Sequence, residues 1–380
     1  MKIAFVSHSF YGPYFVVGSH HLARQLARRG HSVWHISAIP WFHLLNVSRS
    51  DYSVRMHRFF QGIIQQEANL KEAVIRPLLP WQMTRGLLNY GNLFLDLSDI
   101  RWLVRMHPDL RDIDVLIIDE PRLNGIEKYI HAKSIYYRPT DLYVDAKNDS
   151  RIQDAEAALL AGCQGLVATS APVLERMLTL RQEIPNLLLT NGVDYDAFTS
   201  PRDEPDALRR IGRPRVVYVG AIDDRFDIGA IRFLAARFPK VNFVIIGDGS
   251  HFEDVQGLAG DNIHVLGLVP YAELNSYLQY CDVGILPLVK SRSNEGRSPL
   301  KLYEFGMSGL PVLASRTPEL GRRTEAFIEL YSDYEEAAET LRRILSQTHD
   351  RSQIVGQCMD HTWSNKAAIL ESFITSTQAS

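Results

Sequence analysis

Cysteine is scarce in this chain, which has three among its 380 residues. They stand far apart, at Cys163, Cys281 and Cys358, so their spacing fits neither a disulfide framework nor a zinc site. We therefore expect three buried thiols in a protein that works in a reducing compartment.

Long hydrophobic runs are also missing from the sequence. No window holds the roughly 20 apolar residues that a membrane-spanning helix needs. The apolar run that begins at Met1 stops at Ser7 and His8, which is too short for the core of a signal peptide. We therefore expect a cytoplasmic protein.

Net charge is small, at −3, but it is unevenly distributed along the chain. Residues 1–95 carry ten Lys and Arg against three Asp and Glu, a surplus of seven, and the remainder sums to −10. Aromatic residues and leucines interleave with this surplus at 40–45, 58–60 and 76–88. Such a surface suits anionic lipid or nucleic acid, but no nucleic-acid motif accompanies it. Packing inside the first domain stays open; we favour peripheral contact with the inner face of the cell membrane.

Short apolar runs alternate with segments of helical period throughout the chain, which predicts an α/β fold with parallel sheets. The expected strands of the first half are residues 3–7, 33–37, 54–59, 115–119, 135–138, 166–169 and 187–190. Those of the second half are residues 216–220, 243–247, 264–266, 283–287 and 311–315.

The chain is longer than one hydrophobic core usually serves, so we expect two domains. The polar, proline-marked segment 199–206 is typical of a linker. We place a first domain at 1–198, a second at 207–360, and a C-terminal helix and tail at 361–380 that returns to the first domain. Doubly wound sheets bind ligands at the carboxyl ends of their strands, which predicts a substrate site between the domains.

The stretch 297–314 is the most informative one, reading Arg-Ser-Pro-Leu-Lys-Leu-Tyr-Glu-Phe-Gly-Met-Ser-Gly-Leu-Pro-Val-Leu-Ala. Lys301 and Glu304 are three residues apart and share a helix face. Ser298 and Pro299 suit a helix start, whose amides and dipole favour phosphate. A surface ion pair is the alternative. The small-residue turn at 306–309, running into the strand at 311–315, favours a site for a nucleotide-sugar diphosphate.

Several further motifs follow in order: Asn-Gly-Val-Asp at 191–194, Val-Gly-Ala-Ile-Asp at 219–223, Ile-Ile-Gly-Asp-Gly at 245–249, Val-Leu-Gly at 265–267 and Asp-Val-Gly-Ile-Leu-Pro at 282–287. Together they make the second half similar to a GT-B glycosyltransferase. In the first half, Tyr-Tyr-Arg-Pro-Thr-Asp at 136–141 resembles the Tyr-Arg-x-Ser-Asp element of the GumK-type β-glucuronosyltransferases of xanthan assembly. The resemblance implies two Rossmann-like, doubly wound domains facing across a cleft.

The resemblance also implies an inverting transfer in which Asp141 is the catalytic base. From the residues alone, a helix cap is the favoured role of Asp141, and the resemblance makes it the best candidate for the base. Lys301 would hold the diphosphate and Glu304 would orient ribose hydroxyls. The residues expected to contact the donor are Gly220, Ile222, Gly247, Leu288, Ser298, Leu300, Lys301 and Glu304.

Acceptor-side candidates come from the loops that follow strands in the first half. They are His8, Gly18, Asp119, Glu120 and Arg138, although His8 also suits a polar loop and Asp119 and Glu120 also suit turn chemistry. We expect His20 and His21 to serve packing and surface roles rather than to form a metal pair, since adjacent helical side chains diverge. We assign no metal to Asp112 and Asp114, which precede their strand.

The sequence thus predicts a hexosyltransferase that moves a sugar, glucuronic acid as the first candidate, from a UDP-sugar to a lipid-linked saccharide in exopolysaccharide assembly. The UDP-sugar is a co-substrate, and we expect no cofactor, metal or nucleic acid. Three alternatives stay open: a retaining GT-B enzyme, a nucleotide-sugar epimerase, and a non-catalytic nucleotide-sugar-binding protein. The retaining pattern has seven residues between two glutamates, whereas eight separate Glu295 and Glu304, and no lysine closely follows Gly220.

Overall fold

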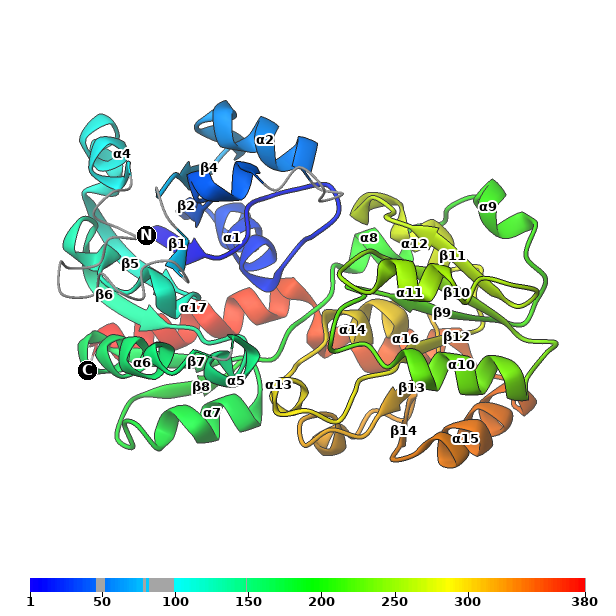
Figure 1. The fold of residues 1–380 in the computed structure, drawn as a ribbon. Helices are drawn as coiled ribbons and strands as arrows, with labels where there is room; N and C mark the ends of the chain where they lie inside the picture. The colour runs from blue at the N-terminus through cyan, green and yellow to red at the C-terminus, as the bar shows by residue number, and fades with distance from the viewer. Residues whose placement is uncertain (46–51, 78–79, 82–98, 148, 380) are drawn as a thin grey trace. The chain divides into compact units, whose positions relative to one another are not determined.

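The computed structural model describes residues 1–45, 52–77, 80–81, 99–147 and 149–379, and these divide into two compact units. Unit 1 comprises Met1–Gly12, Val16–Thr190 and Lys366–Ser380, and unit 2 comprises Pro13–Phe15 and Asn191–Asn365. Each unit is built on a largely parallel sheet flanked by helices (Figure 1). The expected α/β class is therefore confirmed.

Unit 1 contains a sheet of order β3-β4-β2-β1-β5-β6-β7-β8, parallel except between β3 and β4. Its strands are β1 (Lys2–Ser7), β2 (Ser32–Ala38), β3 (Ile64–Glu67), β4 (Leu70–Ile75), β5 (Asp112–Ile118), β6 (His131–Tyr137), β7 (Gly165–Ala168) and β8 (Asn186–Leu188). Its helices are α1 (Gly18–Arg28), α2 (Tyr52–Gln61), α4 (Ile100–Met106), α5 (Tyr143–Lys147), α6 (Arg151–Gly162), α7 (Ala171–Leu178) and, from Lys366 onward, α17 (Trp363–Ala379).

The central strands of unit 1 are apolar on both faces because helices cover the sheet on both sides. In β1, residues 3–6 are fully buried, and in β5, residues 115–118 are fully buried. Polar residues follow directly where these strands end, at Ser7 and at Asp119. The carboxyl edge of the sheet is therefore where charged side chains gather in this unit.

The prediction of a strand at 54–59 is wrong, because these residues lie in helix α2. The apolar residues Val54 and Met56 alternate with polar ones over a short stretch, which imitates a strand. Only Arg58 and Phe59 of α2 are buried, as expected for a short helix lying on the surface of a unit. The strand that pairs in parallel with β2 is instead β4, which the sequence analysis did not predict.

Unit 2 contains a parallel sheet of order β11-β10-β9-β12-β13-β14. Its strands are β9 (Arg215–Val219), β10 (Asn242–Ile246), β11 (Ile263–Gly267), β12 (Val283–Leu286), β13 (Val312–Ser315) and β14 (Ile328–Tyr331). Its helices are α8 (Tyr195–Thr199), α9 (Asp206–Arg209), α10 (Ile228–Arg237), α11 (Phe252–Gln256), α12 (Leu274–Leu278), α13 (Arg292–Glu295), α14 (Leu300–Met307), α15 (Tyr334–Ser346) and α16 (Arg351–Cys358). The five expected strands are confirmed within one or two residues, and β14 was missed.

The C-terminal residues 366–379 belong to unit 1 and are held there by specific contacts. Glu371 accepts from Arg29 at 2.6 Å and from His31 at 2.9 Å, and Tyr136 donates its hydroxyl to the Ile374 carbonyl at 3.3 Å. These contacts join the end of the chain to its beginning. The three cysteines are buried thiols, as expected.

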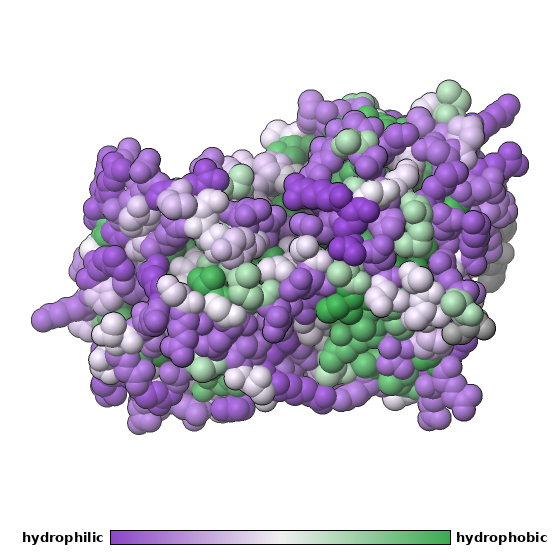
Figure 2. Space-filling model, turned by 180° about the vertical axis from the view of Figure 1, so that it is seen from behind, coloured by the Kyte–Doolittle hydropathy of each residue, from purple (hydrophilic) through white to green (hydrophobic). Residues whose placement is uncertain are grey.

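Within the part of the chain that the structure describes, none of the helices combines the length and the apolar character needed to cross a membrane. Figure 2 shows one face of the molecule, on which polar residues predominate and apolar residues gather in limited patches.

Helix α6 brings a carboxyl group into the interior of unit 1. Glu156 is 1% exposed and accepts a hydrogen bond of 3.0 Å from the Tyr137 hydroxyl on β6. Burial raises the pKa of Glu156 to about 7, although the Tyr137 bond and the charge of Arg176 oppose this shift. At pH 8 the folded protein therefore holds a buried carboxylate with no cation in hydrogen-bonding contact among the described residues.

This burial predicts a pH-dependent effect of Glu156→Gln. The folded pKa lies above the ordinary value of 4.5, so the contribution of Glu156 to stability falls as pH rises from about 4.5 to 7. The shift corresponds to about 3 kcal/mol. We expect Glu156→Gln to raise the melting temperature relative to wild type at pH 8 and to change it little at pH 5. The exposed Glu183→Gln is the control; identical pH profiles for wild type and Glu156→Gln would contradict the prediction.

Candidate functional site

Two glycine-containing loops meet at the carboxyl edge of the sheet in unit 2. The Gly220 amide donates to the Ile246 carbonyl at 3.0 Å, and the Ile222 amide donates to the Asp248 carbonyl at 3.0 Å. A Cβ on Gly247 would lie 1.9 Å from the Gly220 carbonyl oxygen, and the φ of Gly247 is +152°. Glycine is therefore required for this close backbone approach. The loops after β9 and β10 are therefore packed backbone against backbone at this edge.

A third loop, which follows β12, joins the same edge. Leu288 forms a bridge with Phe226 and donates its amide to the Ser315 hydroxyl at 2.8 Å. Asn294 donates its side-chain amide to the Arg225 carbonyl at 3.2 Å. The loops after β9, β12 and β13 are thereby tied to one another, so Ile222 and Leu288 lie at the predicted edge.

Helix α14 begins beside this edge, with Pro299 at its N-cap and Leu300 as its first residue. Ser298 is 7% exposed; its carbonyl accepts from the Asn191 side chain at 2.6 Å, and its hydroxyl accepts from the Asn191 amide at 3.3 Å. The Asn-Gly-Val-Asp motif is thus packed against the start of the helix within unit 2. The first turn of α14 receives no hydrogen bond from its N-cap side chain, since that residue is proline.

Lys301 and Glu304 form the ion pair that their spacing predicts. The Lys301 Nζ lies 2.5 Å from Glu304 Oε2 and 5.2 Å from the centroid of the Tyr271 ring. The side chain of Glu304 is 2% exposed and that of Lys301 is 21% exposed. The pair is therefore not the surface pair of the alternative interpretation. A buried carboxylate holds the cation, and part of the ammonium group faces outward.

Sequence reasoning missed two arginines of this edge. Arg225 forms an ion pair with Asp223 in the loop after β9, with a hydrogen bond of 2.7 Å from its Nε. Burial of Asp223 would raise its pKa, but the hydrogen bonds and charge of Arg225, together with the charge of Arg297, outweigh burial and lower it. Arg225 stands five residues after Gly220, and a search for cations close to the glycine loop would have found it.

In unit 1, two of the acceptor-side candidates, Asp119 and Arg138, form a buried ion pair. Arg138 Nη1 donates to Asp119 Oδ2 at 2.8 Å, and both side chains are at most 2% exposed. Burial raises the pKa of Asp119 to about 6 in spite of the neighbouring Arg138. Asp119 directly follows β5 and Arg138 directly follows β6, and these strands are adjacent. The pair therefore forms part of the carboxyl edge of unit 1.

Glu120, the residue after Asp119, has a lowered pKa rather than a raised one. It accepts from Arg122 Nε at 2.7 Å and Nη2 at 2.8 Å, and it caps the short 3-10 helix Pro121–Leu123. Burial would raise the pKa of Glu120, but Arg122 together with His8 lowers it to about 2. His8 is exposed and lies close enough to Glu120 to affect it electrostatically. The structure thus brings His8 to the same edge as the two acids.

Asp141 lies in a bend three residues after Arg138 and is half-buried. Helix α5 begins at Tyr143, and the Ala146 amide donates to the Leu142 carbonyl at 2.8 Å, which makes Leu142 the residue before the helix. The capping position therefore falls on Leu142 rather than on Asp141. The Tyr143 hydroxyl donates to the Asp119 carbonyl at 2.9 Å, so α5 is anchored to the same edge.

The loop after β1 leads into a buried histidine network. Gly18 is buried as the first residue of α1. His20 and His35 are both 0% exposed, and their rings lie 4.7 Å apart. Burial lowers the pKa of His20 to about 3, so the ring is neutral, and it accepts from the Val17 amide at 3.3 Å. His20 and His21 are both buried, so the expected packing is confirmed and the expected surface position is wrong. Among the described residues, no group of three His, Cys, Asp or Glu side chains is arranged to hold a metal ion.

The candidates thus gather at two places. Those on the donor side lie at the carboxyl edge of the sheet in unit 2, and those on the acceptor side lie at the carboxyl edge of β1, β5 and β6 in unit 1. The roles of the individual residues stay predictions.

Comparison with known proteins identifies the second unit more narrowly. Residues 213–347 match the family model described as glycosyl transferases group 1. A curated relative, TuaH of Bacillus subtilis (strain 168), is named as a teichuronic acid biosynthesis glycosyltransferase and is 24% identical over 243 residues. That match covers 57% of this chain and 61% of TuaH, so the chain spans about three fifths of the length of this relative. The expectation of a glycosyltransferase agrees with both findings.

Solved structures match over the whole chain. A sucrose-phosphate synthase from Thermosynechococcus elongatus has a TM-score of 0.70 and 16% identity, covering 100% of this chain and 97% of the other. Anabaena HepE in complex with UDP and glucose has a TM-score of 0.63 and 14% identity, with the same coverage. The names of these relatives do not mention GumK-type enzymes, so the narrower resemblance to that group stays a prediction. The chain has the GT-B fold, and its residues 213–347 match the family model of the glycosyl transferases of group 1.

Proposed function

We propose that this protein is a glycosyltransferase that takes its sugar from a UDP-sugar and delivers it, with inversion, to a lipid-linked saccharide. The observation that carries the proposal is the Lys301–Glu304 pair at the start of α14, inside the segment that matches the group 1 family. A cation held by a buried acid beside backbone-lined loops suits a nucleoside diphosphate.

The donor side supplies binding and charge stabilisation. The glycines after β9 and β10 fix the packing of the two loops at the carboxyl edge, and Lys301 stabilises the negative charge that develops on the departing diphosphate. Glu304 accepts from Lys301 through Oε2 and has a second carboxylate oxygen that suits a ribose hydroxyl. HepE, a structural relative, was solved with UDP and glucose, which supports a UDP-linked donor.

The acceptor side supplies the base. An inverting transfer needs a carboxylate that removes the proton of the acceptor hydroxyl as that oxygen attacks the anomeric carbon. Asp119 and Glu120 are buried in ion pairs with arginines, whereas Asp141 is half-buried. We therefore assign Asp141 as the base and the Asp119–Arg138 pair as the support of its loop. Glucuronic acid is the first candidate donor sugar, on the resemblance of residues 136–141.

The lipid-linked acceptor is supported by exposed aromatic residues rather than by unpaired charge. Several of the basic residues of the N-terminal surplus form ion pairs: Arg24 and Arg28 with Glu67, Arg29 with Glu371, Arg58 with Glu72, Lys71 with Asp109 and Arg76 with Asp99. Arg49, Arg85 and most of residues 78–88 lie outside the described residues.

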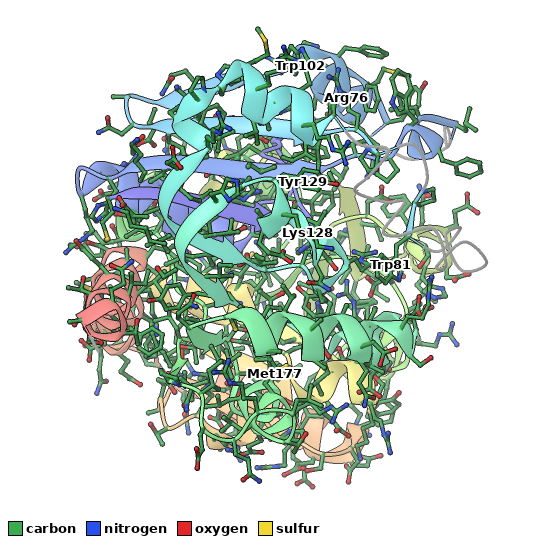
Figure 3. All side chains as sticks on the ribbon, turned by 90° about the vertical axis from the view of Figure 1, so that its left-hand side faces the viewer. Arg76, Trp81, Trp102, Lys128, Tyr129 and Met177 are labelled. Atoms are coloured by element: carbon green, nitrogen blue, oxygen red, sulfur yellow. The ribbon has the colours of Figure 1, made fainter. Side chains whose placement is uncertain are left out.

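Some aromatic residues of the N-terminal segment are interior, as the packing interpretation expected. Trp81 is 8% exposed, donates to Asp149 at 3.1 Å and lies under the guanidinium of Arg151. Figure 3 shows Trp81 on the same face of unit 1 as Trp102, which is 54% exposed on α4.

The exposed group lies on α2 and on the preceding 3-10 helix Trp41–Leu45. Trp41 is 47% exposed, Phe42 43%, Leu45 71% and Phe60 62%, and the Trp41 and Phe60 rings are 6.4 Å apart. Aromatic and leucine side chains grouped in this way suit insertion at the headgroup level of a bilayer.

We expect Lys301→Ala to weaken UDP binding ten- to a hundredfold, because a charge-assisted bond to the diphosphate is worth roughly 1.5–3 kcal/mol. Calorimetric titration with UDP measures the effect, and the exposed Lys240→Ala is the control. The substitution also leaves the buried Glu304 without its cation, which lowers stability. The double variant Lys301→Ala/Glu304→Gln removes that instability; if it also regained wild-type UDP affinity, Lys301 would not contact the diphosphate.

We expect Asp141→Asn to reduce the transfer rate by about 10²–10⁴-fold while UDP affinity and melting temperature stay near those of wild type. The amide has almost the same volume but does not take up a proton. Asp145→Asn, on α5, is the matched control. Rates are measured as UDP release with lipid extract as acceptor, and NMR of the product gives the anomeric configuration. Near-normal turnover in Asp141→Asn would move the search for the base to Asp119 and Glu120.

We expect wild-type protein to float with vesicles that contain anionic lipid, and the double variant Phe42→Ser/Leu45→Ser to float at least tenfold less. Each buried large apolar side chain contributes about 1.5–3 kcal/mol, so the loss of two exceeds a factor of ten. Met359→Ser, an exposed apolar position of unit 2, is the control. Equal flotation of the double variant and wild type would remove this surface from membrane contact.

A further inference from the structure

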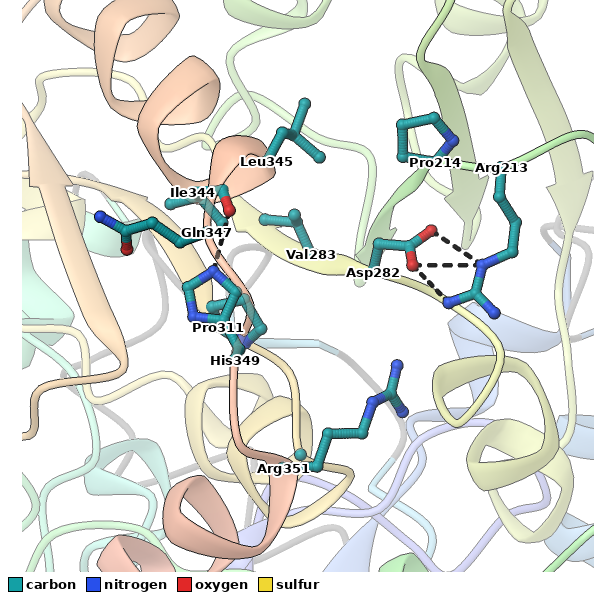
Figure 4. A pocket seen from close by; sticks show the side chains of 11 residues that line it. Arg213, Pro214, Asp282, Val283, Pro311, Ile344, Leu345, Gln347, His349 and Arg351 are labelled. Carbon is teal, nitrogen blue, oxygen red and sulfur yellow. Dashed lines mark hydrogen bonds and ion pairs between the residues drawn. The ribbon is translucent and has the colours of Figure 1, made fainter.

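The pocket shown in Figure 4 has a volume of about 230 Å³ and lies at the amino edge of the sheet in unit 2, opposite to the glycine loops. Both of its arginines are engaged by the protein itself. Arg213 donates to the Asp282 carboxylate at 3.1 and 3.2 Å. Arg351 donates to the carbonyls of Gln279 at 2.9 Å and Cys281 at 2.6 Å. The charges of this pocket are therefore satisfied internally, which is not true of the start of α14.

The hydroxyl of Ser298, directly before the N-cap of α14, is hydrogen-bonded only as an acceptor. Its Oγ accepts from the Asn191 backbone amide at 3.3 Å and from Arg323 Nη2 at 3.4 Å. A hydroxyl has two lone pairs and one proton, so both acceptor positions are occupied. Among the residues that the structure describes, none accepts the proton of this hydroxyl. Ser298 is 7% exposed, and a buried donor without an acceptor is unfavourable.

This unused donor stands where the helix lacks one. Pro299 is the N-cap of α14 and has no amide hydrogen. The N-terminus of a helix favours an anion through its unpaired amides and its dipole, and the Ser298 hydroxyl adds a donor directly before them. Phosphate oxygens are acceptors, so a hydroxyl that is able only to donate is complementary to them.

Arg323 keeps the hydroxyl of Ser298 in this state. It directly follows the short 3-10 helix Leu320–Arg322, in the segment after β13. Its Nη1 donates to the Tyr303 hydroxyl at 3.0 Å, and its Nη2 forms an ion pair with Glu319. The side chains of Arg323 and Glu319 are 10% and 4% exposed. The charge of Arg323 is thus compensated by Glu319, and its guanidinium serves the protein rather than a ligand.

We propose that Arg323 is a positioning residue of the donor site, which occupies a lone pair of Ser298 Oγ and so directs the Ser298 proton to a phosphate oxygen of the donor. The inference rests on the proposed function, because it requires a diphosphate at the N-terminus of α14. The planar fork of Arg323 contacts both Ser298 and Tyr303, and Lys301 lies between these two residues in the sequence. One side chain thereby fixes the segment that carries the Lys301 ammonium group.

The test is calorimetric titration of the full chain with UDP, ADP and GDP. We expect Ser298→Ala to weaken binding of the diphosphate about tenfold, the loss of one hydrogen bond to a charged group. Ser298→Thr keeps the hydroxyl and should stay within about threefold of wild type. Asn191 still donates to the backbone carbonyl of residue 298 at 2.6 Å in both variants, so the start of the helix keeps its main contact.

The double variant Glu319→Gln/Arg323→Met tests the positioning role without leaving a buried carboxylate unpaired. We expect it to weaken diphosphate binding about three- to tenfold. Adding Ser298→Ala to it should cause little further loss, because both changes act through one hydroxyl. Glu329→Gln/Arg343→Met removes another ion pair of unit 2, on an arginine that is 53% exposed, and should leave affinity unchanged.

A purely structural role would lower the melting temperature and give additive losses of affinity. A further tenfold loss on adding Ser298→Ala to Glu319→Gln/Arg323→Met would therefore overturn the proposal. So would wild-type affinity in Ser298→Ala or in the double variant, or no binding of any of the three diphosphates. Binding of ADP or GDP instead of UDP, with the same losses, would overturn the UDP donor and support this inference, since Ser298 is assigned to the phosphate and not to the base.

Discussion

The burial of Glu304 is the constraint on which the candidate donor site depends. A carboxylate that is 2% exposed is unstable in the interior unless a cation lies against it, and Lys301 meets that need from one turn earlier on α14. The same requirement places the Lys301 ammonium group between Glu304 and the Tyr271 ring, on a side chain that is 21% exposed. A cation placed for stability is thereby available to an anionic ligand, and its position varies little because it is ion-paired and packed over Tyr271.

Buried acids that are paired with cations also occur at the carboxyl edge of unit 1. Asp119 and Glu120 are consecutive residues, yet burial raises the pKa of the first to about 6, and Arg122 together with His8 lowers that of the second to about 2. Each is held by its own arginine, so both side chains have fixed positions before any ligand arrives. Such pre-formed ion pairs reduce the reorganisation that a reaction would otherwise require. Asp141, three residues after Arg138, is half-buried.

The sequence was sufficient to predict those features that depend on neighbouring residues. Continuous apolar runs located the central strands, and the spacing of Lys301 and Glu304 was enough to predict their contact. The sequence was insufficient to predict ion pairs between residues that are far apart along the chain. Arg28 pairs with Glu67 and Arg29 pairs with Glu371, and neither pair has a local signal in the sequence. The helix at 52–61 was mistaken for a strand because a short alternating pattern fits both. Arg213 and Arg351 come together only through the fold.

Helix α14 connects these observations within unit 2. The orphan carbonyls at its C-terminal end attract cations, and Arg351 donates there to the Ser308 carbonyl. The N-terminal end has the opposite polarity and a proline at the N-cap, which supplies no side-chain hydrogen bond to the first turn. Lys301 lies in that first turn, where the helix dipole alone would disfavour a cation, and it is held there by its ion pair with Glu304. The polarity of the helix therefore accounts for Arg351 at the C-terminus, and the burial of Glu304 accounts for Lys301 near the N-terminus.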